Sequence, residues 1–391
     1  MDRVYFDQAS TSFPKGRGVI ETMVKFMSDV GTNINRGSCQ DAYDTARIVY
    51  ETREQLCRHF DFGSTYDMAK NVIFTQNITY ALNFIIKGFL KNGDHVLVSS
   101  MEHNAIMRPL VQLQKMNYIS FDRIPCSQEG ELLFGEIEKL IKSNTKAIFM
   151  THGSNVCGTL MPIERVGSLA RSLGVKFVVD TAQTAGVFPI SMKNMNIDAL
   201  AFTGHKGLLG PQGIGGFLIT DDMADQMESI ITGGTGSISD IEDTPEFLPD
   251  KFEAGTLNIP GIMGLHKSLN YLEEIGIEKI REKEIKLTKT FLEGVSQIEG
   301  LRVIGKKNCE DRCAVVSIQC LSMDEAMLAF TLENKYNIIT RVGMHCAPNA
   351  HKTLGTYPRG TIRFSFGYEN TEEEIDYTIR AITDICSASC D

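Results

Sequence analysis

The feature that most constrains the fold is the regular alternation of short apolar runs with helix-like stretches between residues 71 and 220. Each run is four to eight residues long, apolar or β-branched, and bounded by turn residues, which is typical of buried strands. Stretches such as TYALNFIIKGFLKNG between them repeat apolar residues at intervals of three and four, as amphipathic helices do. Strand–helix alternation predicts an α/β fold with a mainly parallel sheet covered on both faces. The six runs are NVIFT (71–75), HVLVSS (95–100), KAIFMTHG (146–153), KFVVDTA (176–182), DALAFTG (198–204) and GGFLIT (215–220).

The pattern changes near residue 261. A long amphipathic helix interrupted around Gly276 is followed by the strand-like runs LRVIG, CAVVSIQ and TIRFSFG and by two more helical stretches. This arrangement is typical of a smaller α+β unit. We therefore expect a large domain over residues 14–260, a connecting helix over 261–284 and a small C-terminal domain over 285–391, with residues 1–13 packed on the small domain or the large one.

Composition excludes several classes of function. The chain has 391 residues, 42% of them hydrophobic and 23% charged, and a formal net charge of -10. No basic stripe is present, which argues against nucleic-acid binding. No basic stretch leads into an apolar run at the N-terminus, and no apolar run approaches the roughly 20 residues of a membrane span. We expect a cytoplasmic protein with no membrane partner.

Ten cysteines are scattered without a framework spacing, which favours reduced thiols over disulfides in such a chain. Two pairs, Cys309 with Cys313 and Cys386 with Cys390, have the spacing C-x3-C. No histidine is close to either pair in sequence, so we expect no metal site. Whether the pairs have another role stays open.

Polar side chains follow five of the predicted strands at the point where each strand ends. In open α/β sheets, ligands bind outside the carboxyl ends of the strands. Taken singly, Thr79 and Asp180 could be helix caps, His103 a structural hydrogen-bonding group and Lys206 a solvated surface residue. Their convergence on one edge predicts a binding site instead. The residues are Thr79, His103, Asn155, Asp180, Gln183, Thr203, His205 and Lys206.

These groups suit one cofactor. A helix N-terminus with a hydroxyl suits a phosphate, a buried carboxylate suits a protonated ring nitrogen, and an amine in a pocket suits an aldehyde. Phosphate, ring nitrogen and aldehyde together describe pyridoxal 5′-phosphate (PLP).

The chain resembles the class V aminotransferase family of fold type I, and within it the branch of cysteine desulfurases and selenocysteine lyases. The resemblance covers nearly the whole length and implies a PLP-binding large domain and a smaller α+β C-terminal domain. The matching stretches are YFDQASTS, NINRG (33–37), TQNITYALN, MEHNA, THGSNVCGT, VDTAQTAG, FTGHKGLLGPQG, FEAGTLNIPGIMGL, RVGMHCAPNAHKTLGT and GTIRFSFGYENTEEEID.

The resemblance also implies a role for each matching residue. Lys206 would bind the cofactor covalently, Asp180 would pair with its ring nitrogen and His103 would stack on the ring. Asn155 and Gln183 would face the phenolic oxygen. Thr256 would reach the phosphate of a neighbouring subunit, which implies a homodimer. The remaining phosphate-binding residues would be Ile78, Thr79, Thr203 and His205. The substrate carboxylate would be held by Arg363, helped by Asn155, with Arg341 near the nucleophile.

Cys346, in RVGMHCAPN, corresponds to the family's sulfur-accepting cysteine. An irregular loop is expected there, and Arg341 and His345 could favour a thiolate. A thiolate can attack the sulfur of a bound substrate and leave alanine and an enzyme persulfide. The short-loop HCAP form resembles enzymes that pass sulfur to a dedicated acceptor protein.

The sequence therefore predicts a homodimeric, PLP-dependent cysteine desulfurase with Lys206, Cys346 and His103 as catalytic residues. Selenocysteine lyase, another PLP-dependent lyase or aminotransferase, and a non-catalytic scaffold remain as alternatives. The acceptor and its pathway, whether iron–sulfur cluster assembly, tRNA thiolation or selenium handling, stay open.

Overall fold

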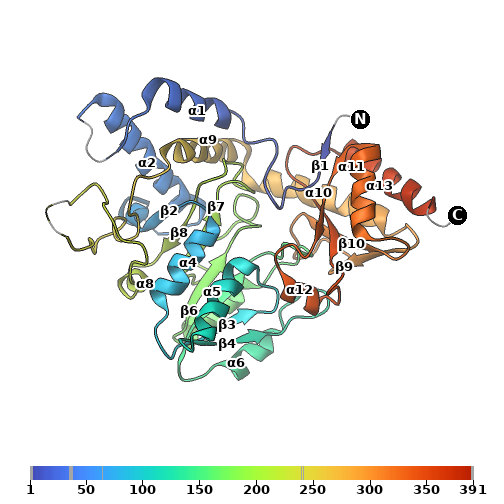
Figure 1. Cartoon of the computed structure of the whole chain (residues 1–391), viewed down its shortest axis with the longest axis horizontal. Coiled ribbons are helices and arrows are strands. Elements are labelled where there is room, and N and C mark those ends of the chain that lie inside the picture. The colour runs from blue at the N-terminus through green and yellow to red at the C-terminus, as the bar shows by residue number, and fades with distance from the viewer. Residues whose placement is uncertain (1–2, 35–37, 64, 239, 241, 389–391) are drawn as a thin grey trace.

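The computed structural model describes residues 3–34, 38–63, 65–238, 240 and 242–388 (Figure 1). Three of the five residues of the NINRG motif (33–37) and Cys390 lie outside the described residues.

The main structural element is a seven-stranded sheet with the order β2-β8-β7-β6-β5-β3-β4. Strands β4, β3, β5, β6 and β7 run parallel, and β8 is antiparallel to both of its neighbours, β7 and β2. β2 therefore points in the same direction as β7, and the predicted mainly parallel sheet is confirmed. The strands are β2 (Val72–Thr75), β3 (His95–Ser99), β4 (Ser120–Ile124), β5 (Thr145–Thr151), β6 (Lys176–Asp180), β7 (Ala199–Thr203) and β8 (Gly215–Ile219).

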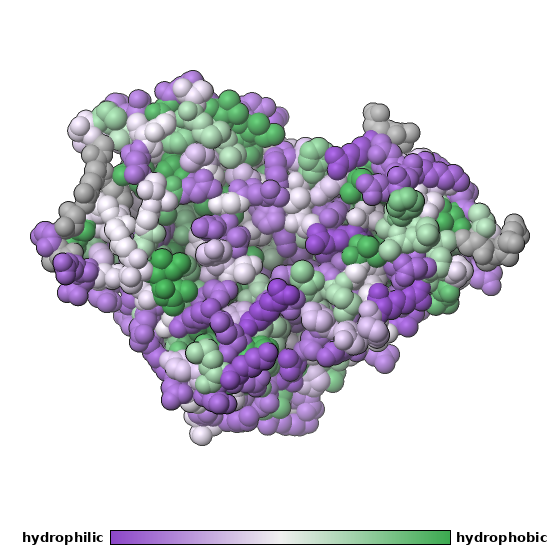
Figure 2. Space-filling model, viewed as in Figure 1, coloured by the Kyte–Doolittle hydropathy of each residue, from purple (hydrophilic) through white to green (hydrophobic). Residues whose placement is uncertain are grey.

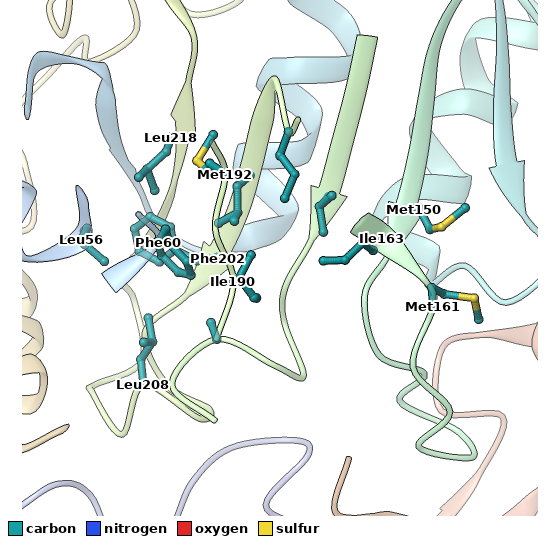
Figure 3. Packing of buried hydrophobic residues seen from close by; sticks show 14 of the residues in the cluster. Leu56, Phe60, Met150, Met161, Ile163, Ile190, Met192, Phe202, Leu208 and Leu218 are labelled. Atoms are coloured by element: carbon teal, nitrogen blue, oxygen red, sulfur yellow. The ribbon is translucent and has the colours of Figure 1, made fainter. Parts of the chain in front are cut away.

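Both faces of this sheet are buried because helices cover each of them, and successive strand residues point alternately to the two sides. Phe177 and Val179 belong to one hydrophobic cluster, and Val178 between them belongs to the other. In Figure 3, Phe60, which follows α2, lies beside Phe202 of β7, with ring centroids 6.2 Å apart. The first cluster is completed by α2 (Gln40–His59), α6 (Ile137–Leu140), α7 (Ile163–Ser172) and α9 (Ile259–Ile275), and the second by α4 (Ile78–Phe89), α5 (Asn104–Lys115) and α8 (Asp221–Asp225).

A smaller antiparallel sheet follows, with the order β12-β13-β10-β9. Gly276 separates α9 from α10, so the predicted interruption of the long helix is confirmed. The sheet and its helices share a third hydrophobic cluster. The elements are α10 (Ile277–Val295), β9 (Leu301–Ile304), β10 (Val315–Cys320), α11 (Glu325–Tyr336), β12 (Arg341–Gly343), α12 (Pro348–Thr353), β13 (Thr361–Ser365) and α13 (Glu372–Ser387).

The N-terminal segment lies against this second sheet. Strand β1 (Val4–Tyr5) pairs in parallel with β11 (Ile338–Ile339), on the same side of the molecule as α13 (Figure 1). Val4 and Phe6 are buried in the third cluster. The chain then crosses to the seven-stranded sheet, which brings residues 7–15 between the two sheets and next to the strand ends that carry the predicted site.

Helix α1 (Val19–Lys25) and the π-helical turn after it (Phe26–Val30) pack on α9. Their outer face carries Ile20, Val24 and Met27, all more than half exposed, and apolar side chains gather over this part of the molecule in Figure 2. The remaining short helix, α3 (Thr65–Met68), precedes β2. Within the described ranges, no helix combines the length and the apolar character that a membrane crossing requires.

Candidate active site

The structure brings the predicted residues together at one edge of the seven-stranded sheet. Because β2, β3, β5, β6 and β7 run in one direction, their carboxyl ends meet at that edge. Asp180 is the last residue of β6 and Thr203 the last residue of β7. His103 begins α5 after β3, and Lys206 lies in the turn after β7.

Asp180 and Lys206 form the charged centre of the site. Asp180 is 2% exposed, and its Oδ1 accepts a hydrogen bond from the Ala182 N–H at 2.8 Å. Burial raises the pKa of Asp180, against the opposing effects of that hydrogen bond and of Lys206. Burial also lowers the pKa of Lys206 from 10.5 to about 8, although Asp180 opposes the shift. The amine is therefore far more nucleophilic near neutral pH than an ordinary lysine.

The glycine after Lys206 is required by close backbone packing. A Cβ atom at Gly207 would lie 2.4 Å from the carbonyl oxygen of Ala185, in the turn that follows Asp180. No other residue fits this approach without moving the backbone. The His-Lys-Gly sequence thus allows the turn after β7 to pack directly on the turn after β6.

His103 is the N-cap of α5, where its Nδ1 accepts a hydrogen bond from the Ala105 N–H at 3.0 Å. Burial, with a smaller contribution from Lys206, lowers the pKa of His103 to about 4, so the ring is neutral near pH 7. The residue before His103 is Glu102, whose buried carboxyl accepts hydrogen bonds from the Ser99 hydroxyl and the Thr151 N–H. Burial raises the pKa of Glu102 to about 8. Glu102 thereby fixes the turn that presents His103.

Two polar atoms in and directly after β7 lack a hydrogen-bond partner in the described part of the chain. They are the Oγ1 of Thr203 and the Nδ1 of His205, and both are buried. Burial lowers the pKa of His205 to about 4.

The N-cap of α4 is Asn77, which accepts a hydrogen bond from the Tyr80 N–H, so the interpretation of Thr79 as a helix cap is wrong. Thr79 is exposed in the first turn of α4, after the buried Ile78, and its hydroxyl is not used for capping.

Two arginines from the small sheet approach the same edge. Arg363, on β13, is 2% exposed and donates from Nη1 to the carbonyl oxygen of Asn155 at 3.0 Å. Its Nη2 donates to Oδ1 of Asp7 and to Oγ of Ser10, both at 2.8 Å. Arg341, on β12, donates to the same Ser10 Oγ at 2.8 Å. The N-terminal segment therefore connects both arginines to the site.

Cys346 lies on an exposed, irregular loop, as predicted. Its φ is 58° and that of His345 is 47°, both in the left-handed region that non-glycine residues seldom occupy. Asn155 donates from Nδ2 to the His345 carbonyl at 2.6 Å, and the Asn104 N–H donates to the Cys346 carbonyl at 2.8 Å. Burial lowers the pKa of His345 to about 2, and its Nε2 contacts Thr361. His345 is therefore uncharged near pH 7 and contributes no positive charge that would favour a thiolate at Cys346.

Gln183 lines a small cavity together with Lys206. It also donates to the carbonyl oxygen of Ala9 at 3.2 Å, so it contacts the N-terminal segment. Thr256 is exposed and lines a cavity of about 560 Å³ and a second one of about 140 Å³, neither of which is lined by Lys206. Among the residues that the structure describes, no group of three or more His, Cys, Asp or Glu is placed to hold a metal ion.

The sequence pattern assigns no role to four residues of this region: Asp7, Ser10, Lys15 and Glu102. The first two belong to the YFDQASTS stretch, whose polar run before a proline is a recognisable pattern. Glu102 directly precedes His103 in MEHNA. Their partners lie too far along the chain for spacing to indicate them.

The sequence profile of the family described as "Aminotransferase class-V" matches residues 4–378. The chain belongs to the class V aminotransferase family. A "Probable cysteine desulfurase" of Methanothermobacter thermautotrophicus is 32% identical over 379 residues, which cover 96% of this chain and 92% of the relative.

Solved structures of this family are similar throughout. A structure titled as the apo form of the cysteine desulfurase from Thermococcus onnurineus NA1 has a TM-score of 0.91 at 30% identity, covering 99% of this chain and 95% of that one. The cysteine desulfurase CsdA from Escherichia coli, in an S-sulfonic acid form, has a TM-score of 0.87 at 26% identity, with coverage of 99% and 95%.

The class V aminotransferase family is PLP-dependent, and the described residues fit that cofactor. Lys206 offers an amine with a lowered pKa, and Asp180 a buried carboxylate with no side-chain partner in the described part of the chain. The unpartnered Thr203 and His205 atoms offer a hydrogen-bonding cradle for a phosphate. The chemistry of the donor set therefore matches the aldehyde, the ring nitrogen and the phosphate.

Proposed function

We propose that this chain is a PLP-dependent cysteine desulfurase, which converts L-cysteine to L-alanine and retains the sulfur as a persulfide on Cys346. One observation favours cysteine desulfurase over the other activities considered for this family. The carbonyl oxygen of Cys346 accepts a hydrogen bond from the N–H of Asn104, the residue after His103. An exposed thiol is thus on a loop that is hydrogen-bonded to the start of α5, next to His103, which supports a role for this thiol in sulfur abstraction.

Bound PLP would supply an acceptor for the electrons released at the substrate Cα. Asp180 would keep the ring nitrogen protonated, and the neutral face of His103 would stack on the ring. Thr79, Thr203 and His205 would hold the phosphate, and Asn155 and Gln183 would face the phenolic oxygen. Lys206 would bind the aldehyde and, once displaced by substrate, would move the proton at Cα. Arg363 would hold the substrate carboxylate.

The sulfur step would use Cys346. Its thiolate would attack the sulfur of the bound cysteine, forming a sulfur–sulfur bond as the carbon–sulfur bond breaks. The electron pair of the broken bond stays with carbon, which takes up a proton to give alanine. The outer sulfur of the persulfide would then pass to a thiol of an acceptor protein. We also propose a homodimer in which Thr256 reaches the phosphate of the neighbouring subunit.

The deciding experiment measures alanine and sulfide released from a panel of amino acids by wild type and Cys346→Ala, with reductant. We expect cysteine to be the sulfur substrate of the wild type and the variant to lose this activity while it retains its visible cofactor absorbance. Cys39→Ala, which removes another exposed thiol, should keep the activity. Alanine release from cysteine at an unchanged rate in Cys346→Ala would rule out this mechanism.

The alanine assay and the reduction of the bound cofactor by borohydride together distinguish the alternatives. The carbon–selenium bond is weaker than the carbon–sulfur bond, so a selenocysteine lyase would release alanine from selenocysteine without Cys346. A non-catalytic scaffold would have no borohydride-sensitive visible absorbance and would not carry the cofactor's mass on Lys206 after reduction. We expect both signatures in the wild type and neither in Lys206→Ala.

A further inference from the structure

Two cationic side chains lie opposite each other on neighbouring strands of the small sheet. Arg341 on β12 is in register with Arg363 on β13. Like charges at directly opposite positions of an antiparallel pair destabilise the sheet. Arg363 is also almost completely buried, and a buried cation is costly unless a counter-ion compensates it. The pair therefore needs a negative charge at this place.

Asp7 supplies that charge from the other end of the chain. Its Oδ1 lies 2.8 Å from Nη2 of Arg363, and its Oδ2 lies 3.8 Å from Nη1 of Arg341. Ser10 donates from Oγ to Oδ1 of Asp7 at 2.7 Å and accepts from both arginines. Asp7 is held in place by a backbone bridge to Ser365, two residues beyond Arg363 on β13.

The net charge of Arg341, Arg363 and Asp7 determines how many further carboxylates these residues can bind. Two arginines and one aspartate leave a net charge of +1, because the nearby His103 and His345 are neutral and Asp180 balances the charge of Lys206. Nε of Arg363 is buried and has no hydrogen-bond partner among the described residues. One net positive charge thus remains, which matches a single carboxylate. A second carboxylate would approach the Asp7 carboxylate and be repelled.

We propose that Asp7 limits the arginine pair to one further carboxylate, and so selects monocarboxylic amino acids over dicarboxylic ones. The inference rests on the proposed function, in which Arg363 receives the substrate carboxylate. Asp7 is thus a specificity-determining residue rather than only a structural partner of Arg363. Without Asp7, the pair would carry a net charge of +2 and would attract dicarboxylic acids.

The test uses two mercapto carboxylic acids. They lack an amino group and so cannot condense with the aldehyde of the cofactor. They are 3-mercaptopropionate, with one carboxylate, and mercaptosuccinate, with two. Calorimetry under reducing conditions gives the affinity of the holoenzyme for each. We expect the wild type to prefer 3-mercaptopropionate, and Asp7→Asn to shift the affinity ratio about tenfold or more towards mercaptosuccinate. A ratio within twofold of wild type in folded Asp7→Asn would overturn the proposal.

Two further variants sharpen the result. Asp222→Asn removes the same charge near the amino end of β6, the end opposite Asp180, and should leave the ratio unchanged. Arg341→Gln alters a half-exposed side chain and tests the charge balance even where Asp7→Asn does not fold. In Arg341→Gln, the remaining pair of Arg363 and Asp7 has no net charge. This variant should therefore bind 3-mercaptopropionate at least fivefold more weakly than the wild type does. Unchanged binding there, or no binding of either acid to wild type, would also overturn the proposal.

Alanine release from cysteine separates this inference from the proposed function. If the ratio shifts as expected but cysteine yields no alanine, the desulfurase assignment fails and the role of Asp7 stands. If cysteine yields alanine and the ratio does not shift, the role of Asp7 alone is refuted.

Discussion

The ammonium nitrogen of Lys15 lies 3.3 Å from the carbonyl oxygen of His205, which belongs to the peptide bond that leads into Lys206. The same carbonyl accepts a hydrogen bond from the Ser12 N–H at 2.8 Å and contacts the Thr11 and Ser12 hydroxyls at 3.2 Å. Four donors from residues 11–15 thus converge on one backbone oxygen next to the reactive lysine. The N-terminal segment therefore positions Lys206 as well as the two arginines.

Lys15→Met should lower the turnover number for alanine release from cysteine about tenfold while changing KM less than twofold. The variant keeps the apolar stem of the side chain but removes the donor, so the Lys206 backbone loses part of its anchor. Small displacements of catalytic groups cost this much or more. Steady-state kinetics provides the measurement, with Lys15→Arg as a partial rescue and Lys25→Met, at the end of α1, as a neutral control. A tenfold rise in KM at constant turnover would contradict a positioning role.

The amine of Lys206 in cofactor-free protein should become reactive with a midpoint near pH 8, well below the ordinary value of 10.5. Burial disfavours the ammonium form, so the neutral amine forms as the pH rises through about 8. Asp180 raises the pKa of Lys206, so Asp180→Asn should move the midpoint further down. Mass spectrometry of the Lys206 peptide after pulsed acylation at successive pH values measures both midpoints. An upward shift in Asp180→Asn would refute the electrostatic coupling.

Asp180→Asn should also reduce turnover by roughly two orders of magnitude with little loss of thermal stability. An amide cannot supply the negative charge that keeps a ring nitrogen protonated, and preorganised charges of this kind contribute about 3 kcal/mol. The buried carboxylate itself is costly, so its neutral isostere should not weaken the fold. Kinetics and thermal unfolding of the same preparation give the two quantities. Near-normal turnover would reduce Asp180 to a cap of the turn at Ala182.

Glu284→Gln should stabilise the protein more at pH 8 than at pH 5. Glu284 is buried on α10 beside a cavity of about 40 Å³ that Lys206 and Cys313 also line, and burial raises its pKa from 4.5 to about 8. At pH values between 4.5 and about 8, the carboxyl of Glu284 is ionised in the unfolded chain but protonated in the folded protein. Stability therefore falls as the pH rises through this window, and glutamine removes the effect.

Melting temperatures of wild type and Glu284→Gln at pH 5 and pH 8 test this. The gain from the substitution should be larger at pH 8 by roughly 2 °C or more. Glu282→Gln, on an exposed position of the same helix, should show no such difference between the two pH values. An equal gain at both pH values would mean that the Glu284 carboxyl ionises in the folded protein as it does in the unfolded chain.

The strand ends could be predicted because their geometry follows from local pattern. Apolar runs separated by amphipathic helices require a parallel sheet, and a parallel sheet brings the residues after each strand to one edge. Asp180, Thr203 and Lys206 therefore followed from the sequence alone. Strand β4 did not, because Ser120 and Arg123 on it are exposed and the run SFDRI lacks the continuous apolar character of the inner strands.

Other parts of the site depend on contacts that no local pattern encodes. The neutral state of His345 follows from its burial and, to a smaller extent, from the charge of Arg363, and both depend on β13 being in place. The capping of α4 by Asn77 rather than Thr79 is a choice between two suitable residues two positions apart. The pairing of Asp7 with Arg363 joins residues 356 positions apart.

That last separation determines when the site can exist during synthesis. Strand β1 is synthesised before the seven-stranded sheet, whereas its partner β11 follows that sheet and the arginine that Asp7 binds comes 356 positions after Asp7. The seven-stranded sheet can form earlier from residues 72–219, with Lys206 already in its turn. Because such long-range contacts form late, a nascent chain would carry a reactive lysine before Asp7 and Arg363 are paired, and substrate selection would begin only after β13 has emerged.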